Sequence, residues 1–234
     1  MKNLKLSFLL LLAASLTLVS CKEEETTPTP DTAKVMVVHA SPNAPGVDLL
    51  VDNTKVNTSA LTFPNNTGYL TVNAGARNFK VNVTGTSTTV IDATPTLAKD
   101  VNYSVFAIDS VSKISPIITV DDLTAPAAGK AHIRFIHLSP NAPAVDVSVV
   151  GQAAGVGIFT NRTFNKTITA GQYAFTPVDA ATYNLEVRVA GTTTVALAIG
   201  SVTLTAGKIY TVFAKGFLGG TGAQALGAQI IANN

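Results

Sequence analysis

One decapeptide occurs twice in this chain and limits what the chain can fold into. His39-Ala-Ser-Pro-Asn-Ala-Pro-Gly-Val-Asp48 returns as His137-Leu-Ser-Pro-Asn-Ala-Pro-Ala-Val-Asp146, with eight of the ten positions identical. Each copy follows an apolar run and precedes an alternating run; the apolar runs are Val35–Val38 and Ile133–Ile136, and the alternating runs are Val47–Val51 and Val145–Val149. Because proline cannot donate to a β-ladder, this order indicates a strand, a rigid loop and a second strand.

Short alternating stretches continue through both halves of the chain, about seven to a copy. Phe79, Val81 and Val83, for example, alternate with Lys80 and Asn82. This period of two, interrupted by turn residues, predicts an all-β chain with two tandem antiparallel β-sandwiches of the immunoglobulin-like or transthyretin-like kind. The predicted divisions are a signal peptide (1–20), a lipidated cysteine and Thr/Pro-rich tether (21–33), a first repeat (34–123), a linker (124–129) and a second repeat (130–234).

The alternation also predicts which way the strand residues face. Arg134 takes the place of Met36 in the second copy, so we expect this face of the strand to meet solvent. His39 ends the opposite, inward face, whereas Asp48 starts an outward one. Since each copy has its own set of strands, we expect the copies to fold independently around separate cores.

The N-terminus has the features of a bacterial lipoprotein signal. Lys2 and Lys5 precede the apolar segment Leu6–Leu18, which is too short to span a bilayer comfortably. Leu18-Val19-Ser20-Cys21 resembles the lipobox, in which Cys21 carries diacylglycerol on its sulfur and a further acyl chain on its amine. Several acyl chains anchor a protein stably to a membrane. The alternative is an ordinary signal peptide that contains a cysteine.

The residues behind the cysteine suggest where the anchored protein lies. The acidic cluster Lys22, Glu23, Glu24 and Glu25 resembles the surface-export signal of Bacteroidetes lipoproteins, although a solvated spacer is the alternative. We therefore expect a protein in the outer membrane, anchored by lipid and facing the cell exterior. Two short segments resemble the O-glycosylation sequon of the same phylum, and their candidate acceptors are Thr32 and Ser110.

Composition excludes one class of partner. Only 13% of residues are charged and 47% are hydrophobic, with no Trp. Removal of Lys2 and Lys5 with the signal peptide leaves 14 basic residues against 14 acidic ones. Without a basic surface to neutralise phosphates, nucleic-acid binding is not expected.

Three polar residues recur in the decapeptide and could carry chemistry: His39 and His137, Ser41 and Ser139, and Asp48 and Asp146. A Ser-His-Asp triad requires the histidine to lie between the other two side chains. The predicted alternation separates His from Asp, and no nucleophile elbow is present. We therefore interpret the set as structural, with the histidine donating to the loop backbone and Ser and Asp capping loop N–H groups; a ligand site is the alternative.

A metal site and a sugar-stacking platform are two further possibilities. Asp48 and Asp52 could supply oxygen ligands to Ca²⁺, but Gly151 lies near the place of Asp52 in the second copy, so we expect no metal and no cofactor. Five tyrosines could stack on sugars, although their strand positions favour core packing with the hydroxyl near the rim: Tyr69, Tyr103, Tyr173, Tyr183 and Tyr210.

The signature His-x-Ser-Pro-Asn-Ala-Pro-x-Val-Asp resembles domain-of-unknown-function family 4397, found in bacterial secreted and surface proteins. Gly68-Tyr-Leu-Thr-Val-Asn-Ala-Gly75 resembles the same family; the second copy has Asp179-Ala-Ala181 in place of its Ala-Gly turn. The resemblance implies an extracellular all-β domain and no established activity. The leading hypothesis is a non-catalytic surface module for adhesion, ligand binding or envelope structure, with an extracellular glycan or protein as ligand. A carbohydrate-binding accessory lipoprotein of a transport or degradation system is the alternative, and a hydrolase the third.

Overall fold

The computed structural model describes residues 30–168 and 172–234. The predicted signal peptide, the lipid-bearing Cys21 and the export signal Lys22–Glu25 lie outside these residues. Within the described ranges, no helix is long and apolar enough to cross a membrane.

The first half of the chain forms a β-sandwich. Its inner sheet has the order β10-β9-β1-β4, with β1 Thr32–His39, β4 Asn66–Asn73, β9 Asn102–Ile108 and β10 Ser115–Asp121. Its outer sheet has the order β3-β2-β6-β7, with β2 Val47–Val51, β3 Thr54–Lys55, β6 Phe79–Val83 and β7 Thr89–Ala93. Two short strands pair beside them, β5 Gly75–Ala76 and β8 Thr96–Leu97, and a 3-10 turn, η1 (Val111–Lys113), precedes β10.

The second half repeats this arrangement. Its inner sheet is β14-β11-β17-β18, with β11 Lys130–His137, β14 Thr176–Asp179, β17 Ile209–Lys215 and β18 Gly227–Ala232. Its outer sheet is β13-β12-β15-β16, with β12 Val145–Val149, β13 Phe159–Arg162, β15 Thr182–Val189 and β16 Val195–Thr203; η2 (Gly222–Gln224) precedes β18. The predicted all-β sandwich class is confirmed. One pairing in each inner sheet is parallel, however: β1 with β9 and β11 with β17.

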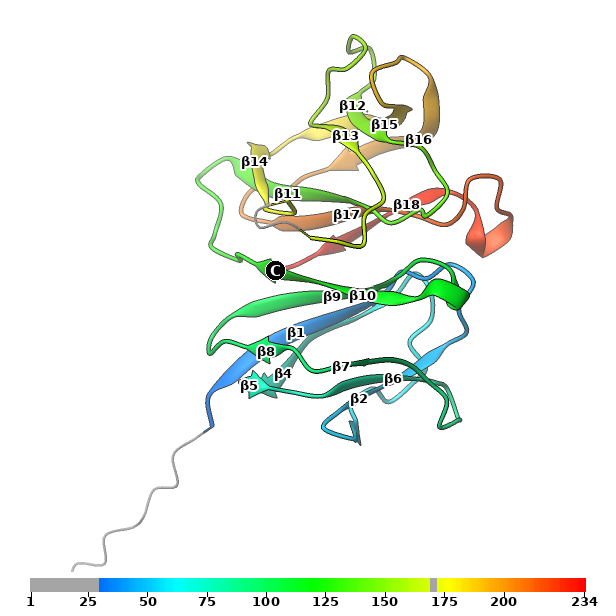
Figure 1. The fold of residues 1–234 in the computed structure, drawn as a ribbon. Coiled ribbons are helices and arrows are strands. Elements are labelled where there is room, and N and C mark those ends of the chain that lie inside the picture. The colour runs from blue at the N-terminus through cyan, green and yellow to red at the C-terminus, as the bar shows by residue number, and fades with distance from the viewer. Residues whose placement is uncertain (1–29, 169–171) are drawn as a thin grey trace, which may run out of the picture.

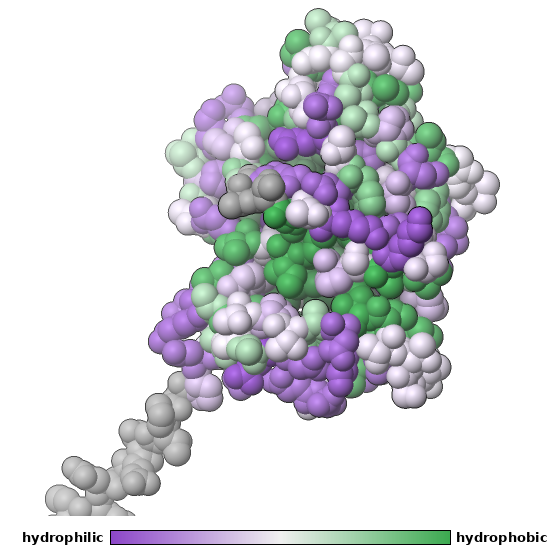
Figure 2. Space-filling model, in the orientation of Figure 1, coloured by the Kyte–Doolittle hydropathy of each residue, from purple (hydrophilic) through white to green (hydrophobic). Residues whose placement is uncertain are grey.

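The four sheets stack into four layers, because the two inner sheets pack on each other (Figure 1). Three apolar layers result. One lies inside the first sandwich and one inside the second. The third, which we call the shared core, joins the two: Met36, Val38, Ala40, Phe106, Ile108, Ile117, Ile136, Leu138, Tyr173, Phe213 and Ile231. Figure 2 shows apolar surface gathered in the hollow between the two sandwiches.

The prediction that one face of the first strand of each copy meets solvent is therefore wrong. Met36 is 1% exposed and Arg134 is 0% exposed, because each points into the space between the inner sheets. Strands buried on both faces carry continuous apolar runs instead of alternating ones. The arginine is tolerated there because polar groups of both sandwiches surround it.

The tether also ends earlier than predicted. Strand β1 begins at Thr32, and Ala33, which was assigned to the tether, is 2% exposed in the first core. The carbonyl of Asp31 accepts a hydrogen bond from the N–H of Ala74 at 2.7 Å. Pairing with β4 thus reaches into the last residues of the predicted tether.

Candidate functional site

The decapeptide forms the connection from the inner to the outer sheet in each sandwich. It leaves β1 and enters β2 in the first copy, and leaves β11 and enters β12 in the second. Its asparagine fastens a neighbouring loop. Asn43 Oδ1 accepts from the Val111 N–H at 2.8 Å. Asn141 makes two bonds to Leu218, accepting from its N–H at 2.8 Å and donating to its carbonyl at 3.0 Å. Figure 1 shows η1 and η2, beside these two contacts, at the same end of the molecule.

The signature histidines are held by the loops that they begin. His39 Nε2 lies 3.0 Å from the Pro45 carbonyl, and His137 Nε2 lies 3.0 Å from the Pro143 carbonyl. A carbonyl only accepts, so Nε2 carries the proton in both rings. Burial lowers the pKa of both histidines below the ordinary value, so both rings are neutral at pH 7. This is the loop contact that the sequence predicted.

The signature serines are not activated. Ser41 and Ser139 are fully buried, and neither hydroxyl has a hydrogen-bond partner among the described residues, so the prediction that these serines cap loop N–H groups is wrong. Nδ1 of His39 and of His137 is likewise without one. A nucleophilic serine needs a base within hydrogen-bond reach. The Ser–His bond of a triad is therefore not formed in either copy.

The signature aspartates point away from the sandwich cores, as predicted, but they are buried on that outer face. Asp146 is 1% exposed, and its two oxygens accept from the N–H groups of Asn161 at 2.7 Å and Gly191 at 2.8 Å. Asp48 accepts from the N–H of Gly85 at 3.2 Å and pairs with Lys55 at 2.8 Å. The alternation gives their direction but not their burial, because strand β13 and the turns at Gly85 and Gly191 bring N–H donors to this face. These carboxylates accept from N–H groups of strand β13 and of hairpin turns in the outer sheets, not from their own Pro-rich loop.

The acidic residues considered as calcium ligands are hydrogen-bonded to other groups of the protein. Asp52 accepts from Arg77 at 3.1 Å and from the Asn78 N–H at 3.0 Å. Within residues 30–168 and 172–234, no group of three or more His, Cys, Asp or Glu side chains could hold a metal ion.

The candidate glycosylation sites and the tyrosines are placed as follows. Thr32 is a half-buried strand residue whose carbonyl accepts from the Asp100 N–H at 2.8 Å. Ser110 is half-buried in the turn before η1, where its N–H donates to Asp109 at 2.6 Å. Three tyrosine hydroxyls bond nearby loop backbone, as the core-packing interpretation predicts: Tyr103, Tyr183 and Tyr210.

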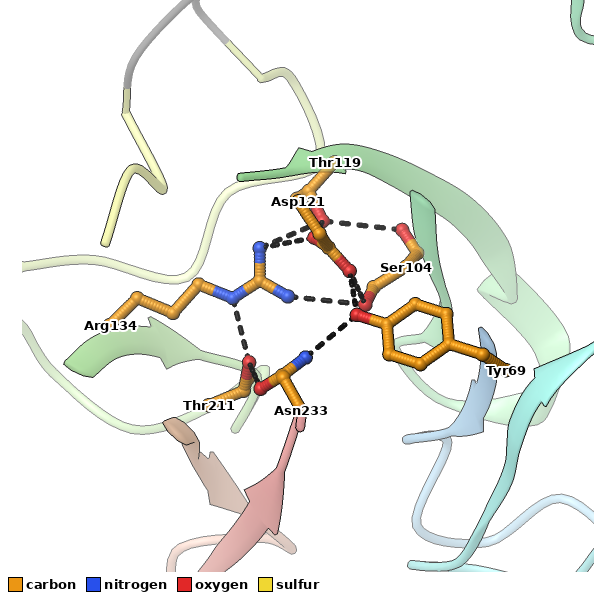
Figure 3. A network of polar contacts seen from close by, with 7 residues as sticks. All are labelled: Tyr69, Ser104, Thr119, Asp121, Arg134, Thr211 and Asn233. Carbon is orange, nitrogen blue, oxygen red and sulfur yellow. Dashed lines mark hydrogen bonds and ion pairs between the residues drawn. The ribbon is translucent and has the colours of Figure 1, made fainter. Parts of the chain in front are cut away.

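Sequence reasoning missed a buried polar network between the sandwiches (Figure 3). Arg134 pairs with Asp121 at 2.7 Å and donates to Ser104 at 3.1 Å and to Thr211 at 2.8 Å. Its side chain is 1% exposed and that of Asp121 is 0% exposed. Arg134 also lies over the ring of Phe175, 4.4 Å from its centroid. Residues of both halves thus satisfy one buried ion pair.

The network reaches the C-terminus and β4. Tyr69 donates to Asp121 at 2.6 Å and accepts from Asn233 at 3.0 Å, and Asn233 in turn accepts from Thr211 at 2.8 Å. Burial and the neighbouring Asp121 charge raise the pKa of the Tyr69 hydroxyl, so it remains protonated and donates. One sequence signal could have revealed this network. An arginine inside an apolar run can be interpreted as buried and paired with an acidic residue.

Two cavities, one in each sandwich, are candidate ligand sites. One, of about 280 Å³, opens in the second sandwich, and His137, Pro143 and Val145 contribute to its wall. The other, of about 450 Å³, lies in the first sandwich and is lined by Val56–Leu61, Asn65–Thr67 and Leu70. The wall of the cavity in the second sandwich is almost wholly apolar, whereas the wall of the cavity in the first sandwich contains both polar and apolar residues.

Comparison with known proteins gives one family. The family model described as "Domain of unknown function (DUF4397)" matches residues 7–148, which include the first sandwich and the second decapeptide. No curated protein matches the chain. One solved structure, described as "Alpha-glucan binding by a streptococcal virulence factor", aligns with 14% identity over 77% of this chain and 92% of that chain. Its TM-score of 0.25 is too low to bear on fold or ligand. Since the family model covers more than half of the chain, the chain belongs to the DUF4397 family.

Proposed function

We propose that this protein is a non-catalytic binding module, anchored by lipid to the outer membrane and displayed on the cell exterior. The observation that carries the non-catalytic part is the use of the signature polar groups. The histidines bond their own loops, the aspartates cap backbone N–H groups, and the serine hydroxyls lack a base. A hydrolase needs these groups to converge on a substrate, and here they do not.

The position of the tether supports a binding role for the signature end. Strand β1 starts at Thr32, where the tether arrives, and runs straight into the decapeptide after His39. Eight extended residues span about 26 Å. The tether therefore joins the body at one end, while both decapeptides lie at the other (Figure 1). An anchor at residue 21 would hold the signature end away from the membrane.

The anchoring is tested by fractionation. Cys21→Ser should move the protein from the membrane fraction to the soluble fraction after a carbonate wash, with Thr26→Ala as a matched tether control that stays in the membrane. Retention of the Cys21→Ser protein would contradict the lipid anchor.

Surface display is tested separately. Replacing Glu23–Glu25 with alanine should leave the protein lipidated but protected from protease added to whole cells. Cleavage equal to that of the parent would contradict surface display.

A carbohydrate ligand is the second candidate, favoured by the mixed cleft of the first sandwich. Its wall contains uncharged polar side chains, among them Thr58, Ser59 and Asn66, which suit sugar hydroxyls. The Asn57 amide is occupied, since it accepts from the Leu49 N–H and donates to two carbonyls. Titration calorimetry with neutral oligosaccharides should give binding that Ser59→Tyr removes, and no heat in the parent would reject this candidate.

A further inference from the structure

The apolar cavity of the second sandwich lies between its two sheets at the signature end. It measures about 280 Å³, and no charged side chain contributes to its wall. The lining includes His137 and Pro143 of the decapeptide, Val145 of β12, Val195 and Ala196 of β16, and Leu218 of the loop before η2. A smaller apolar cavity of about 80 Å³ continues the same inter-sheet layer through Phe135 and Val147.

The mouth of the cavity is apolar as well. Val195 is 47% exposed and Leu218 is 49% exposed. Ile230, at the smaller cavity, is 42% exposed. Two of the seven large exposed apolar residues in the described part of the chain therefore line this cleft, and a third lines the smaller cavity. Asn141 holds Leu218 in place through its two hydrogen bonds.

The first sandwich provides an internal comparison, because its ladder registers match. Asn82 pairs with Thr89 in the first copy and Arg188 pairs with Val195 in the second, which makes Thr89 the counterpart of Val195 and Val90 that of Ala196. Of the two cavities in the second sandwich, the smaller one has its counterpart in a first-sandwich cavity of about 20 Å³, lined by Val37, Leu49 and Ile91 among others. At these two positions the second copy has Ala196 in the wall, where the first has the larger Val90. It has the apolar Val195 at the mouth, where the first has Thr89.

We propose that this cleft binds an uncharged, mainly aliphatic small molecule or chain end, inserted between the sheets past Val195 and Leu218. The inference rests on the proposed binding role and names the class of its ligand.

The chemistry of the wall selects this class. An apolar cavity does not hold water well, and an engineered cavity of about 150 Å³ already binds benzene-sized molecules. A charged ligand would lose its hydration with no opposite charge in the wall to replace it. Burial lowers the pKa of His137, so this wall residue is uncharged at neutral pH. Exposure of leucine and valine at the mouth further favours transfer of an apolar chain from water.

The test uses the purified protein without its signal peptide and the uncharged fluorescent probe N-phenyl-1-naphthylamine. The parent should bind the probe with enhanced fluorescence, and 1-octanol should displace it. Ala196→Leu, which fills the wall, should weaken binding at least about tenfold. Leu218→Ser changes an exposed residue and should weaken binding without unfolding the protein. Val111→Ser, at the loop position that Asn43 holds in the first copy, is the matched control and should bind as the parent does.

The outcomes separate cleanly. Weaker binding in Ala196→Leu and Leu218→Ser, with Val111→Ser unchanged, supports the cleft. Should Ala196→Leu misfold, as its circular dichroism would show, Leu218→Ser against Val111→Ser still decides. No binding by the parent, or equal binding by all folded variants, overturns the inference. Neither result would alter the fractionation and protease tests of the proposed surface role.

Discussion

At the residue scale, the signature aspartates are backbone caps. Asp146 accepts from two backbone N–H groups, one in strand β13 and one in a turn, at a site that is 1% exposed, and none of the described side chains forms an ion pair with it. Asp48 divides its contacts between one backbone N–H, a threonine hydroxyl and Lys55. Buried donors that lose their acceptor destabilise the folded state.

We predict that Asp146→Ala lowers the free energy of unfolding by about 2–4 kcal/mol, because two backbone N–H groups lose their acceptor at roughly 1–3 kcal/mol each. Urea denaturation followed by circular dichroism measures the change. Asp179→Ala, whose carboxylate is 77% exposed beside Lys130, is the control and should change stability little. Equal losses in the two variants would show that the Asp146 contacts contribute nothing specific.

The two histidines predict a pH dependence of stability. Burial holds their folded pKa below 6.5, so the unfolded chain binds more protons as pH falls below that value. Their contribution is therefore complete above about pH 6.5 and is lost as pH falls from 6.5 towards the lowered folded pKa. The melting temperature should fall from pH 7 to pH 5, and the double variant His39→Gln, His137→Gln should fall less over this range. A slope that the double variant leaves unchanged would assign the dependence to other groups.

At the scale of elements, the sequence predicts the outer sheets better than the inner ones. Alternation correctly places Leu49, Phe79 and Val81 inside the first sandwich. The run at Val35–Val38 is continuous because both faces of β1 are covered. The interpretation of Arg134 as a solvent-facing residue missed the second covering layer, because the partners of that arginine come from strands of both sandwiches. The histidine-to-loop contact was predictable because its partners are six residues apart. The contacts of Asp146 with Asn161 and Gly191 were not, because the pairing of neighbouring strands sets them.

The buried ion pair gives a prediction for strand β11. Arg134→Ala leaves the Asp121 carboxylate buried without its cation and should destabilise the protein by about 3–5 kcal/mol. The double variant Arg134→Met, Asp121→Asn removes both charges and should lose less than the single variant. Chemical denaturation of both proteins measures the difference. A double variant as unstable as Arg134→Ala would mean that the charge balance at this site is unimportant.

At the scale of the whole molecule, the two sandwiches are joined by a core that neither could cover alone. The shared core includes Met36 and Phe106 from the first half and Ile136 and Phe213 from the second. Arg134 and Asp121 connect the halves through the middle of that layer. The sequence predicts that each copy folds independently around its own core. Separating the two sandwiches, however, would expose the shared core and break the Arg134 network. The structure instead favours one rigid body that presents both decapeptides at one end.

Differential scanning calorimetry of the chain without its signal peptide tests this central claim most directly. If the shared core couples the halves, the protein should unfold in a single transition whose calorimetric enthalpy equals its van't Hoff enthalpy. Arg134→Ala should lower the midpoint of that one transition. Two resolved transitions, or a calorimetric enthalpy near twice the van't Hoff value, would contradict the account and show that the sandwiches unfold independently.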